Sequence, residues 1–98
     1  MLNHVALYNF KKDMDASDRK IAAVKLKEGF ENLMGKIDGL MSISVEIILQ
    51  DTSTADFYLK AKFRDKDALF SFNNSPLLFN IRSELDKVEV IHTADYVV

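Results

Sequence analysis

Residues 57–76 constrain the fold of this chain more than any other stretch, because a strand and a helix meet there without a linker. From Phe57 to Arg64, apolar and polar side chains alternate, which is typical of a strand with one buried face. Asp65 follows at once, and its carboxylate is suited to cap the free N–H groups of a helix. We expect that helix to end before Pro76, because proline disfavours helical geometry in the preceding residue.

The other apolar patterns predict the remaining elements. The predicted ranges are strands at 2–10, 41–49 and 88–98, a helix at 15–37 capped by Asp15 or Ser17 and closed by Asp38-Gly39, and a helical piece from Pro76 to Leu85. Gly29, inside the long helix, would fit the close approach of a strand. The resulting order is strand, helix, strand, strand, helix, strand. It predicts an α+β, ferredoxin-like βαββαβ subunit with a four-stranded antiparallel sheet, as one domain over residues 1–98.

Residues 50–56 are polar and rich in turn formers, so the second and third strands should form a hairpin. A loop centred near Ser53 would place Glu46 opposite Lys60 and Val45 opposite Ala61. This register matches acid with base and apolar with apolar, and we take it as a hypothesis.

Composition excludes several classes of function. The 98 residues carry 13 Lys+Arg and 15 Asp+Glu, a net charge of −2, so no nucleic-acid partner is predicted. There is no cysteine, which excludes a disulfide framework and a thiol nucleophile. No stretch reaches the roughly 20 apolar residues of a membrane span, and residues 1–4 do not begin a signal peptide. We predict a soluble, cytoplasmic protein without a membrane partner.

Two helices can cover only one face of a four-stranded sheet. The first and last strands of the chain nevertheless carry apolar residues on both parities, including Val5 and Leu7 in the first and Ile91 and Val97 in the last. Monomers rarely expose a large apolar patch, and a second copy packed sheet to sheet would cover it. We therefore predict a homodimer through the sheet face. A monomer with scattered surface valines is the alternative.

Several short motifs occur in a distinctive order. They are the segment 4–11, the glycine turn at Gly39, the junction 63–69, Pro76 after a short helix, and Asp95-Tyr96. Together they resemble the stress-responsive α/β-barrel domain family, often called Dabb, over essentially the whole chain. The resemblance implies a dimeric α/β barrel with helices outside and a pocket between sheet and helices. Family members include plant stress proteins, bacterial proteins of unknown role and a plant polyketide cyclase.

The resemblance makes His4 the candidate catalytic residue. In cyclase-type members the matching histidine works with a second histidine and a tyrosine, and Leu78 and Phe72 occupy those positions here. His4 could act as a general base, because imidazole titrates near neutrality, or it could be a structural histidine. His92 lies on a strand expected beside the first, so the two histidines could approach each other. Two nitrogen ligands make a weak metal site, and we predict no metal and no cofactor.

The pocket itself should be lined by aromatic and aliphatic side chains. The predicted ligand-binding residues are Tyr8, Phe30, Leu59, Ala61, Phe72, Leu78 and Phe79. Ordinary core packing is the alternative for this set. Two functions follow: a protein that binds a small apolar or aromatic molecule, or a cofactor-independent enzyme, cyclase-like or monooxygenase-like, that uses His4. The enzyme requires acid–base groups that converge on His4, whereas the binder requires only an apolar cavity.

Overall fold

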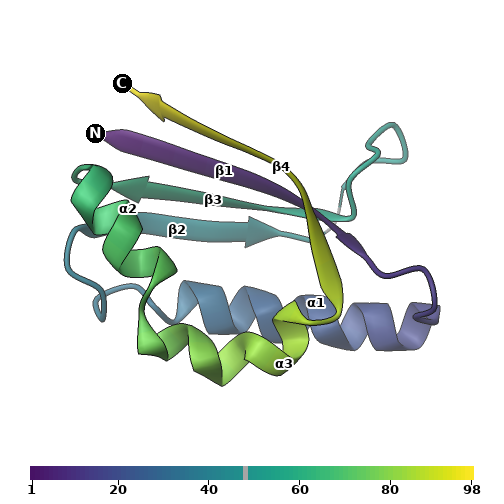
Figure 1. The fold of residues 1–98 in the computed structure, drawn as a ribbon. Coiled ribbons are helices and arrows are strands. Elements are labelled where there is room, and N and C mark those ends of the chain that lie inside the picture. The colour runs from purple at the N-terminus through teal and green to yellow at the C-terminus, as the bar shows by residue number, and fades with distance from the viewer. Residues whose placement is uncertain (48) are drawn as a thin grey trace.

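The computed structural model describes residues 1–47 and 49–98, and Figure 1 shows its fold. The elements are β1 (Leu2–Phe10), α1 (Ala16–Glu31), β2 (Leu40–Glu46), β3 (Phe57–Phe63), α2 (Lys66–Asn73), the 3-10 helix η1 (Pro76–Ile81), α3 (Arg82–Leu85) and β4 (Val88–Val97). The predicted ferredoxin-like order is confirmed. The predicted strand at 41–49 is shorter than expected, and Ile48 lies outside the described residues.

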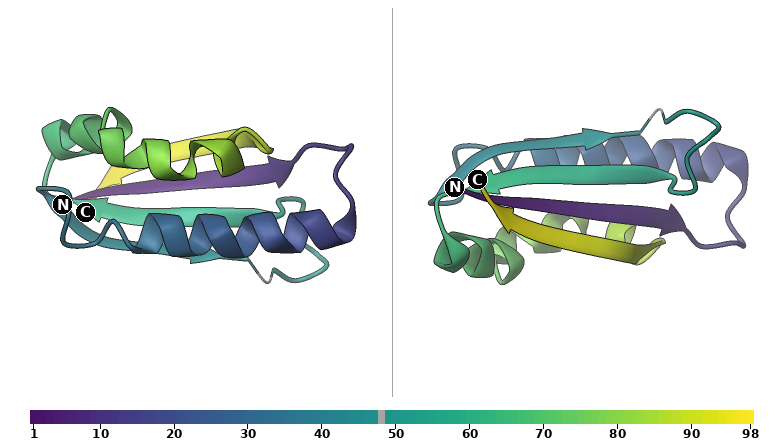
Figure 2. Two further views of the ribbon diagram at one scale, coloured as in Figure 1. Left: turned by 90° about the horizontal axis from the view of Figure 1, so that it is seen from below. Right: turned by 90° about the horizontal axis from the view of Figure 1, so that it is seen from above.

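The four strands form one antiparallel sheet in the order β2-β3-β1-β4. Helix α1 and the α2–η1–α3 segment lie on the same face of this sheet (Figure 2). Among the described residues, no element covers the opposite face, which we call the open face. The core lies between sheet and helices, and its largest fully buried side chains are Phe57, Phe63, Leu26, Leu59 and Val45.

Local capping explains where the helices begin. Asp15 Oδ1 accepts a hydrogen bond from the Asp18 N–H at 2.8 Å, and Asp65 Oδ1 accepts one from the Ala68 N–H at 2.9 Å. Both carboxylates therefore satisfy backbone donors that have no partner within the helix. Pro76 occupies the first turn of η1, where its missing N–H costs nothing.

Helix α1 is shorter than the sequence pattern predicts. It ends at Glu31 with Asn32 as its C-cap, and residues 32–36 form turns before β2. Gly35 adopts φ +85°, a left-handed conformation that glycine reaches without steric cost. The apolar stripe continues through Leu33 and Ile37, which are buried, but a turn carries them to the core. The stripe therefore predicted burial correctly and helix length wrongly.

Gly29 allows a close approach, but to a helix and not to a strand. A Cβ atom at Gly29 would overlap Cγ2 of Ile81 in η1. Any side chain at position 29 would therefore force the Ile81 side chain out of its present contact with α1. The strand contact that could have explained this glycine is therefore replaced by a contact between α1 and η1.

The hypothetical register between β2 and β3 is wrong by two residues. Val45 pairs with Leu59, and Glu46 pairs with Tyr58 instead of Lys60. A shift of two residues keeps every side chain on the same face, so the apolar alternation could not distinguish the two registers. An irregularity between Leu40 and Ser42 also adds one residue to β2.

Strand β4 contains a bulge that changes which residues share a face. Tyr8 pairs with Val90, whereas Leu7 pairs with His92, so Ile91 is the extra residue. Before the bulge, even-numbered residues of β4 lie on the helix-covered face; after the bulge, odd-numbered residues lie there. Strict alternation from the buried Val88 would place Asp95 on the open face, but the bulge turns it to the helix-covered face.

Candidate functional site

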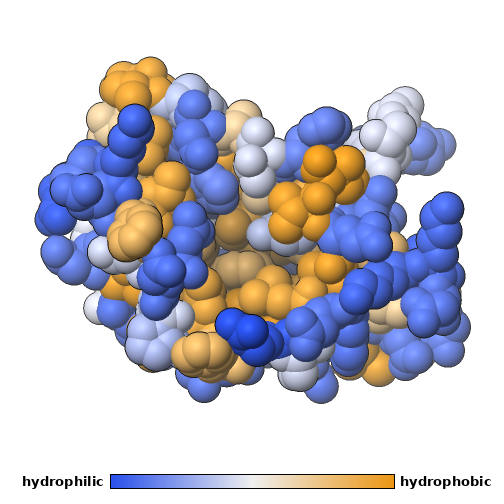
Figure 3. All heavy atoms as spheres, viewed as in Figure 1, coloured by the Kyte–Doolittle hydropathy of each residue, from blue (hydrophilic) through white to orange (hydrophobic). Residues whose placement is uncertain are grey.

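A cavity lies between the sheet and the α2–η1–α3 segment. Its volume is about 270 Å³. Residues from seven elements contribute to its wall: β1, β3, β4, α1, α2, η1 and α3. Seven lining residues are apolar, namely Phe30, Leu59, Phe72, Leu78, Leu85, Val88 and Val90. The polar lining residues are His4, Tyr8 and Asn73. Figure 3 shows a hollow on this side of the molecule, bordered by hydrophobic residues.

His4 pairs with a carboxylate. Its Nδ1 atom lies 2.5 Å from Oδ1 of Asp95, and the two residues are directly paired across β1 and β4. The His4 side chain is 11% exposed and that of Asp95 is 42% exposed. A carboxylate can only accept, so the Nδ1–H donates to it, and in the neutral form of the ring the lone pair lies on Nε2. A histidine oriented in this way can take a proton from a ligand at Nε2.

Tyr8 supplies the second polar group of the cavity wall. Its ring stacks on Phe57 with centroids 4.9 Å apart, which fixes its orientation. Burial raises the pKa of the Tyr8 hydroxyl above its usual value, because a phenolate would lose its hydration. The group is therefore a neutral phenol that can donate a hydrogen bond to a ligand oxygen.

Most of the predicted pocket residues lie together, but two do not. His4, Tyr8, Phe30, Leu59, Phe72 and Leu78 all line the cavity. Ala61 is fully buried and does not line it. Phe79 is 62% exposed and packs against the Arg82 guanidinium, 4.7 Å from its ring centroid, outside the cavity. The irregular η1 turns Phe79 outward while it keeps Leu78 inward.

Sequence reasoning missed Asp95 as the partner of His4. Asp95-Tyr96 was recognised only as a motif near the C-terminus. Because the bulge reverses the parity of β4, no periodicity within the strand assigns Asp95 to the cavity side. The pairing becomes visible only with the register between β1 and β4.

The two histidines do not converge. His4 faces the helices, whereas His92 pairs with Leu7 on the open face. Over residues 1–47 and 49–98, no group of three or more His, Asp or Glu side chains could hold a metal ion. The approach of His4 and His92 that was considered for a metal site therefore does not occur.

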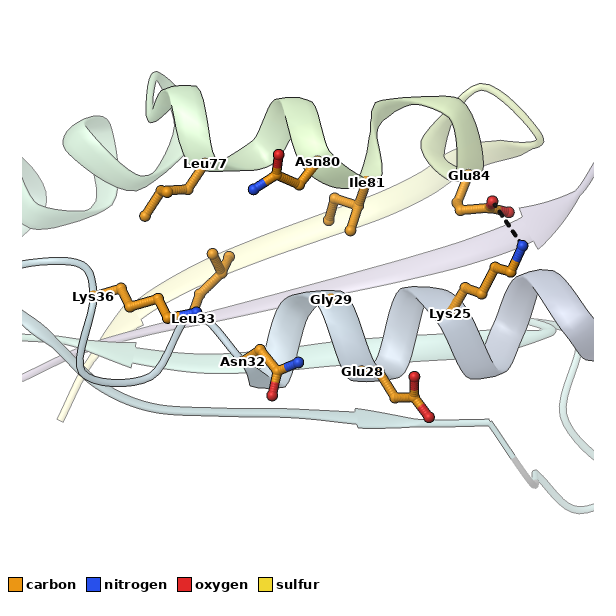
Figure 4. Close-up of a pocket in the computed structure, with 10 residues that line it drawn as sticks. All are labelled: Lys25, Glu28, Gly29, Asn32, Leu33, Lys36, Leu77, Asn80, Ile81 and Glu84. Carbon is orange, nitrogen blue, oxygen red and sulfur yellow. Dashed lines mark ion pairs between the residues drawn. The ribbon is translucent and has the colours of Figure 1, made fainter.

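A second depression lies outside the core, between α1 and the η1–α3 segment (Figure 4). It has a volume of about 480 Å³, and Leu33, Leu77 and Ile81 contribute to its floor. Lys25 and Glu84 form an ion pair at 3.8 Å at one end. Its rim combines lysine, glutamate and asparagine side chains without an arrangement suited to one kind of reaction. The cavity that contains His4 is therefore the better functional candidate.

The fold and the cavity define a class: a ferredoxin-like α+β protein with a cavity between its sheet and its helices. The family model for the stress responsive A/B barrel domain (Dabb) matches residues 2–98. The chain belongs to this family. No curated protein matches it.

Solved structures show the same fold at low sequence identity. A dimeric protein of unknown function from Bacteroides fragilis, described as having a ferredoxin-like fold, is 20% identical with a TM-score of 0.86, covering 99% of this chain and 95% of that one. A protein from Arabidopsis thaliana is 17% identical with a TM-score of 0.74 and coverages of 100% and 95%. A Dabb family protein from Mesorhizobium loti is 18% identical with a TM-score of 0.69 and coverages of 99% and 95%.

None of the described helices is both long enough and apolar enough to span a membrane.

Proposed function

We propose that this protein binds a small apolar or aromatic molecule in the cavity that contains His4 and Tyr8. The observation that carries the proposal is the contrast within the wall: seven apolar side chains surround one phenol, one carboxylate-bound imidazole and the Asn73 amide. Ligand sites are commonly apolar with a few polar groups that orient the ligand. The volume of about 270 Å³ favours a compact ligand such as a substituted ring.

A titration with 1-naphthol tests this proposal, because the probe combines an aromatic ring with one hydroxyl. We expect its fluorescence to change on saturable binding to the wild type. Leu78→Trp fills part of the cavity and should weaken binding by about tenfold or more. Phe79→Trp is the matched control, since Phe79 is exposed on the same 3-10 helix and should leave binding unchanged. Equal affinities for both variants, or no saturable binding to the wild type, would contradict the proposal.

The His4–Asp95 contact favours a second candidate, cofactor-independent acid–base catalysis. The geometry suits removal of a proton next to a ligand carbonyl. His4 Nε2 would take the proton from carbon, and the Tyr8 hydroxyl would donate to the enolate oxygen. The imidazolium would then return a proton to the same carbon. Phe72 and Leu78 replace the polar partners of cyclase-type relatives, so in this proposal Asp95 and Tyr8 are the groups that assist His4.

Deuterium exchange into the methyl group of acetophenone measures this step directly. In D₂O, proton NMR should show loss of the methyl signal faster with the wild type than in buffer. His4→Gln should slow the protein-dependent exchange by ~10²–10⁴-fold, the usual contribution of a general base. His92→Gln is the control, because that histidine lies on the open face. Equal exchange rates with the wild type and with His4→Gln would reject the proposal of catalysis. The proposal of ligand binding does not depend on this result.

We also propose that the protein forms a homodimer through the open face. The structures from Bacteroides fragilis, Jannaschia sp. and Thermobifida fusca are described as dimeric. Nine of the ten residues of β4 are exposed in the single chain, and Val5 and Leu7 are only half-buried. Sedimentation velocity at micromolar concentration should give a dimer of the 11.2 kDa chain. A monomer under these conditions would reject the homodimer.

A further inference from the structure

A groove borders the cavity that contains His4. It has a volume of about 420 Å³, and its lining residues all come from the continuous stretch 73–86, which is drawn in green in Figure 1. They are Asn73, Asn74, Ser75, Leu78, Phe79, Arg82, Leu85 and Asp86. Five of these eight residues carry polar or charged side chains, so the groove differs in character from the apolar cavity beside it.

The groove and the cavity share a boundary. Three residues line both hollows, namely Asn73, Leu78 and Leu85. A layer of core residues would separate the two hollows completely. Here, however, Asn73 is exposed, and Leu78 and Leu85 are only half-buried. These side chains therefore form a common rim, over which a ligand can extend from the cavity into the groove.

Arg82 and Asp86 bring opposite charges to the groove. The Asp86 N–H donates to the Arg82 carbonyl at 3.0 Å, so the two residues are one helical turn apart and their side chains are neighbours. Within residues 1–47 and 49–98, neither side chain forms an ion pair. The Arg82 guanidinium lies over the ring of Phe79, 4.7 Å from its centroid. This cation–π contact holds the guanidinium in place and apart from the Asp86 carboxylate.

The ionic groups next to them already have partners. Lys87 Nζ donates to Glu84 at 3.1 Å, and Lys25 lies 3.8 Å from the other oxygen of the same carboxylate. Lys25 and Glu84 also line the depression on the other side of η1 and α3. Arg82 and Asp86 are therefore the two charged groups that the groove offers to a ligand.

A zwitterion matches these two groups better than an ion of either sign. Asp86 would repel an anion bound at Arg82, and Arg82 would repel a cation bound at Asp86. A molecule with a carboxylate and an ammonium group on one carbon satisfies both. Arginine can donate two parallel N–H bonds to the carboxylate, and the ammonium group can donate to the Asp86 oxygens. An aromatic ring attached to the same molecule can then enter the cavity between Phe30, Leu59 and Phe72.

We propose that the ligand of the cavity is an aromatic α-amino acid. Its ring occupies the cavity, its carboxylate binds Arg82, and its ammonium group binds Asp86. The inference rests on the proposed ligand binding and adds the chemical class of the ligand. Arg82 and Asp86 thereby become determinants of ligand specificity.

Four indoles that share one ring and differ in charge test this assignment. They are 3-methylindole, which is neutral, indole-3-propionate, tryptamine and the zwitterion tryptophan. The chain contains no tryptophan, so indole fluorescence comes from the ligand alone and its anisotropy reports binding. We expect the wild type to bind tryptophan about tenfold more tightly than 3-methylindole, as the sum of two solvent-accessible charge contacts. Added salt should reduce this preference.

Two variants assign each charge to its partner. Arg82→Gln should weaken the binding of tryptophan and indole-3-propionate by about fivefold, without weakening tryptamine. Asp86→Asn should weaken tryptophan and tryptamine by a similar factor, without weakening indole-3-propionate. Both variants should bind 3-methylindole as the wild type does. Lys36→Gln is the control for the loss of one positive charge, because Lys36 does not line the groove, and it should leave all four affinities unchanged.

Tryptophan binding no tighter than 3-methylindole would overturn the proposed ligand class. Wild-type affinities for tryptophan in both Arg82→Gln and Asp86→Asn would also overturn it. If 3-methylindole or 1-naphthol still binds in these cases, the proposed apolar ligand site stands without the charged groups. If none of the indoles and no 1-naphthol binds, the ligand site and the ligand class are both rejected. Phe79→Trp remains a valid control for 1-naphthol, since this probe carries no charge and does not need Arg82.

Discussion

Replacing Gly39 by alanine is expected to destabilise the protein by about 2–5 kcal/mol, combining left-handed strain with overpacking. Gly39 has φ +82°, a conformation that side chains with Cβ rarely adopt. A Cβ atom there would also lie 2.5 Å from Cβ of Ala68 in α2. The Gly39 carbonyl accepts the Arg64 N–H at 2.8 Å, which holds the junction between β3 and α2 beside this turn. Both elements would have to move to admit one methyl group.

Gly35→Ala is the matched control for this prediction. Gly35 has nearly the same dihedral angle, φ +85°, but a Cβ atom there would meet nothing within 4 Å. Its cost should therefore be only the backbone strain, about 1–2 kcal/mol. Urea unfolding of the two variants measures the difference. If both lose the same stability, the contact with Ala68 has no energetic consequence and the account of the junction is wrong.

Removing the Glu31 carboxylate should destabilise the sheet edge by about 1–3 kcal/mol, the cost of leaving a buried backbone donor unpaired. Glu31 Oε2 accepts the Val45 N–H at 3.0 Å, and Lys27 Nζ donates to the Val45 carbonyl at 2.7 Å. The two side chains also pair with each other at 2.8 Å. Side chains of helix α1 thus satisfy the N–H and the carbonyl group of Val45 on the outer edge of β2. These contacts also prevent another strand from pairing with β2 at this residue.

A graded series separates the hydrogen bond from the charge. Glu31→Ala should show the full loss in urea unfolding. Glu31→Gln should lose less, because the amide oxygen can still accept from Val45. Glu28→Gln, on an exposed part of the same helix, should have little effect. Equal stabilities for Glu31→Ala and Glu28→Gln would show that the contact with β2 contributes nothing.

The same carboxylate should make stability depend on pH. Hydrogen bonds from Lys27 and from the Val45 N–H lower the pKa of Glu31 in the folded state. The unfolded chain therefore binds this proton at higher pH than the folded chain does. The contribution is fully present above the unfolded pKa and is lost as the pH falls through the folded pKa. From about pH 6 to about pH 3, Glu31→Gln should lose less stability than the wild type; identical slopes would contradict this.

Several parts of the fold could be predicted because they depend on neighbouring residues. The caps at Asp15 and Asp65 act within one turn, and Pro76 acts on its own backbone. The alternation from Phe57 to Phe63 depends only on the geometry of an extended chain. For the same reason the candidate cavity residues His4 and Tyr8 could be assigned to one face of the first strand.

The errors concern quantities that the local pattern does not encode. Gly35 was present in the sequence, but the apolar stripe continued past it and favoured a longer helix. A shift of two residues in the β2–β3 register leaves each side chain on the same face of the sheet, so the apolar alternation could not reveal this error. Phe79 was assigned to the pocket by its residue type, although the 3-10 geometry of η1 turns it to solvent.

By itself, the sequence determined the order of the elements, the face of each strand that is buried and the family of the protein, since these follow from short-range periodicity and capping. Only the tertiary structure decided that Asp95 meets His4 and that His92 lies on the open face. Those relations depend on a bulge in β4 and on strand registers. They are set by packing between segments far apart in the chain, where a shift of one or two residues changes every partner.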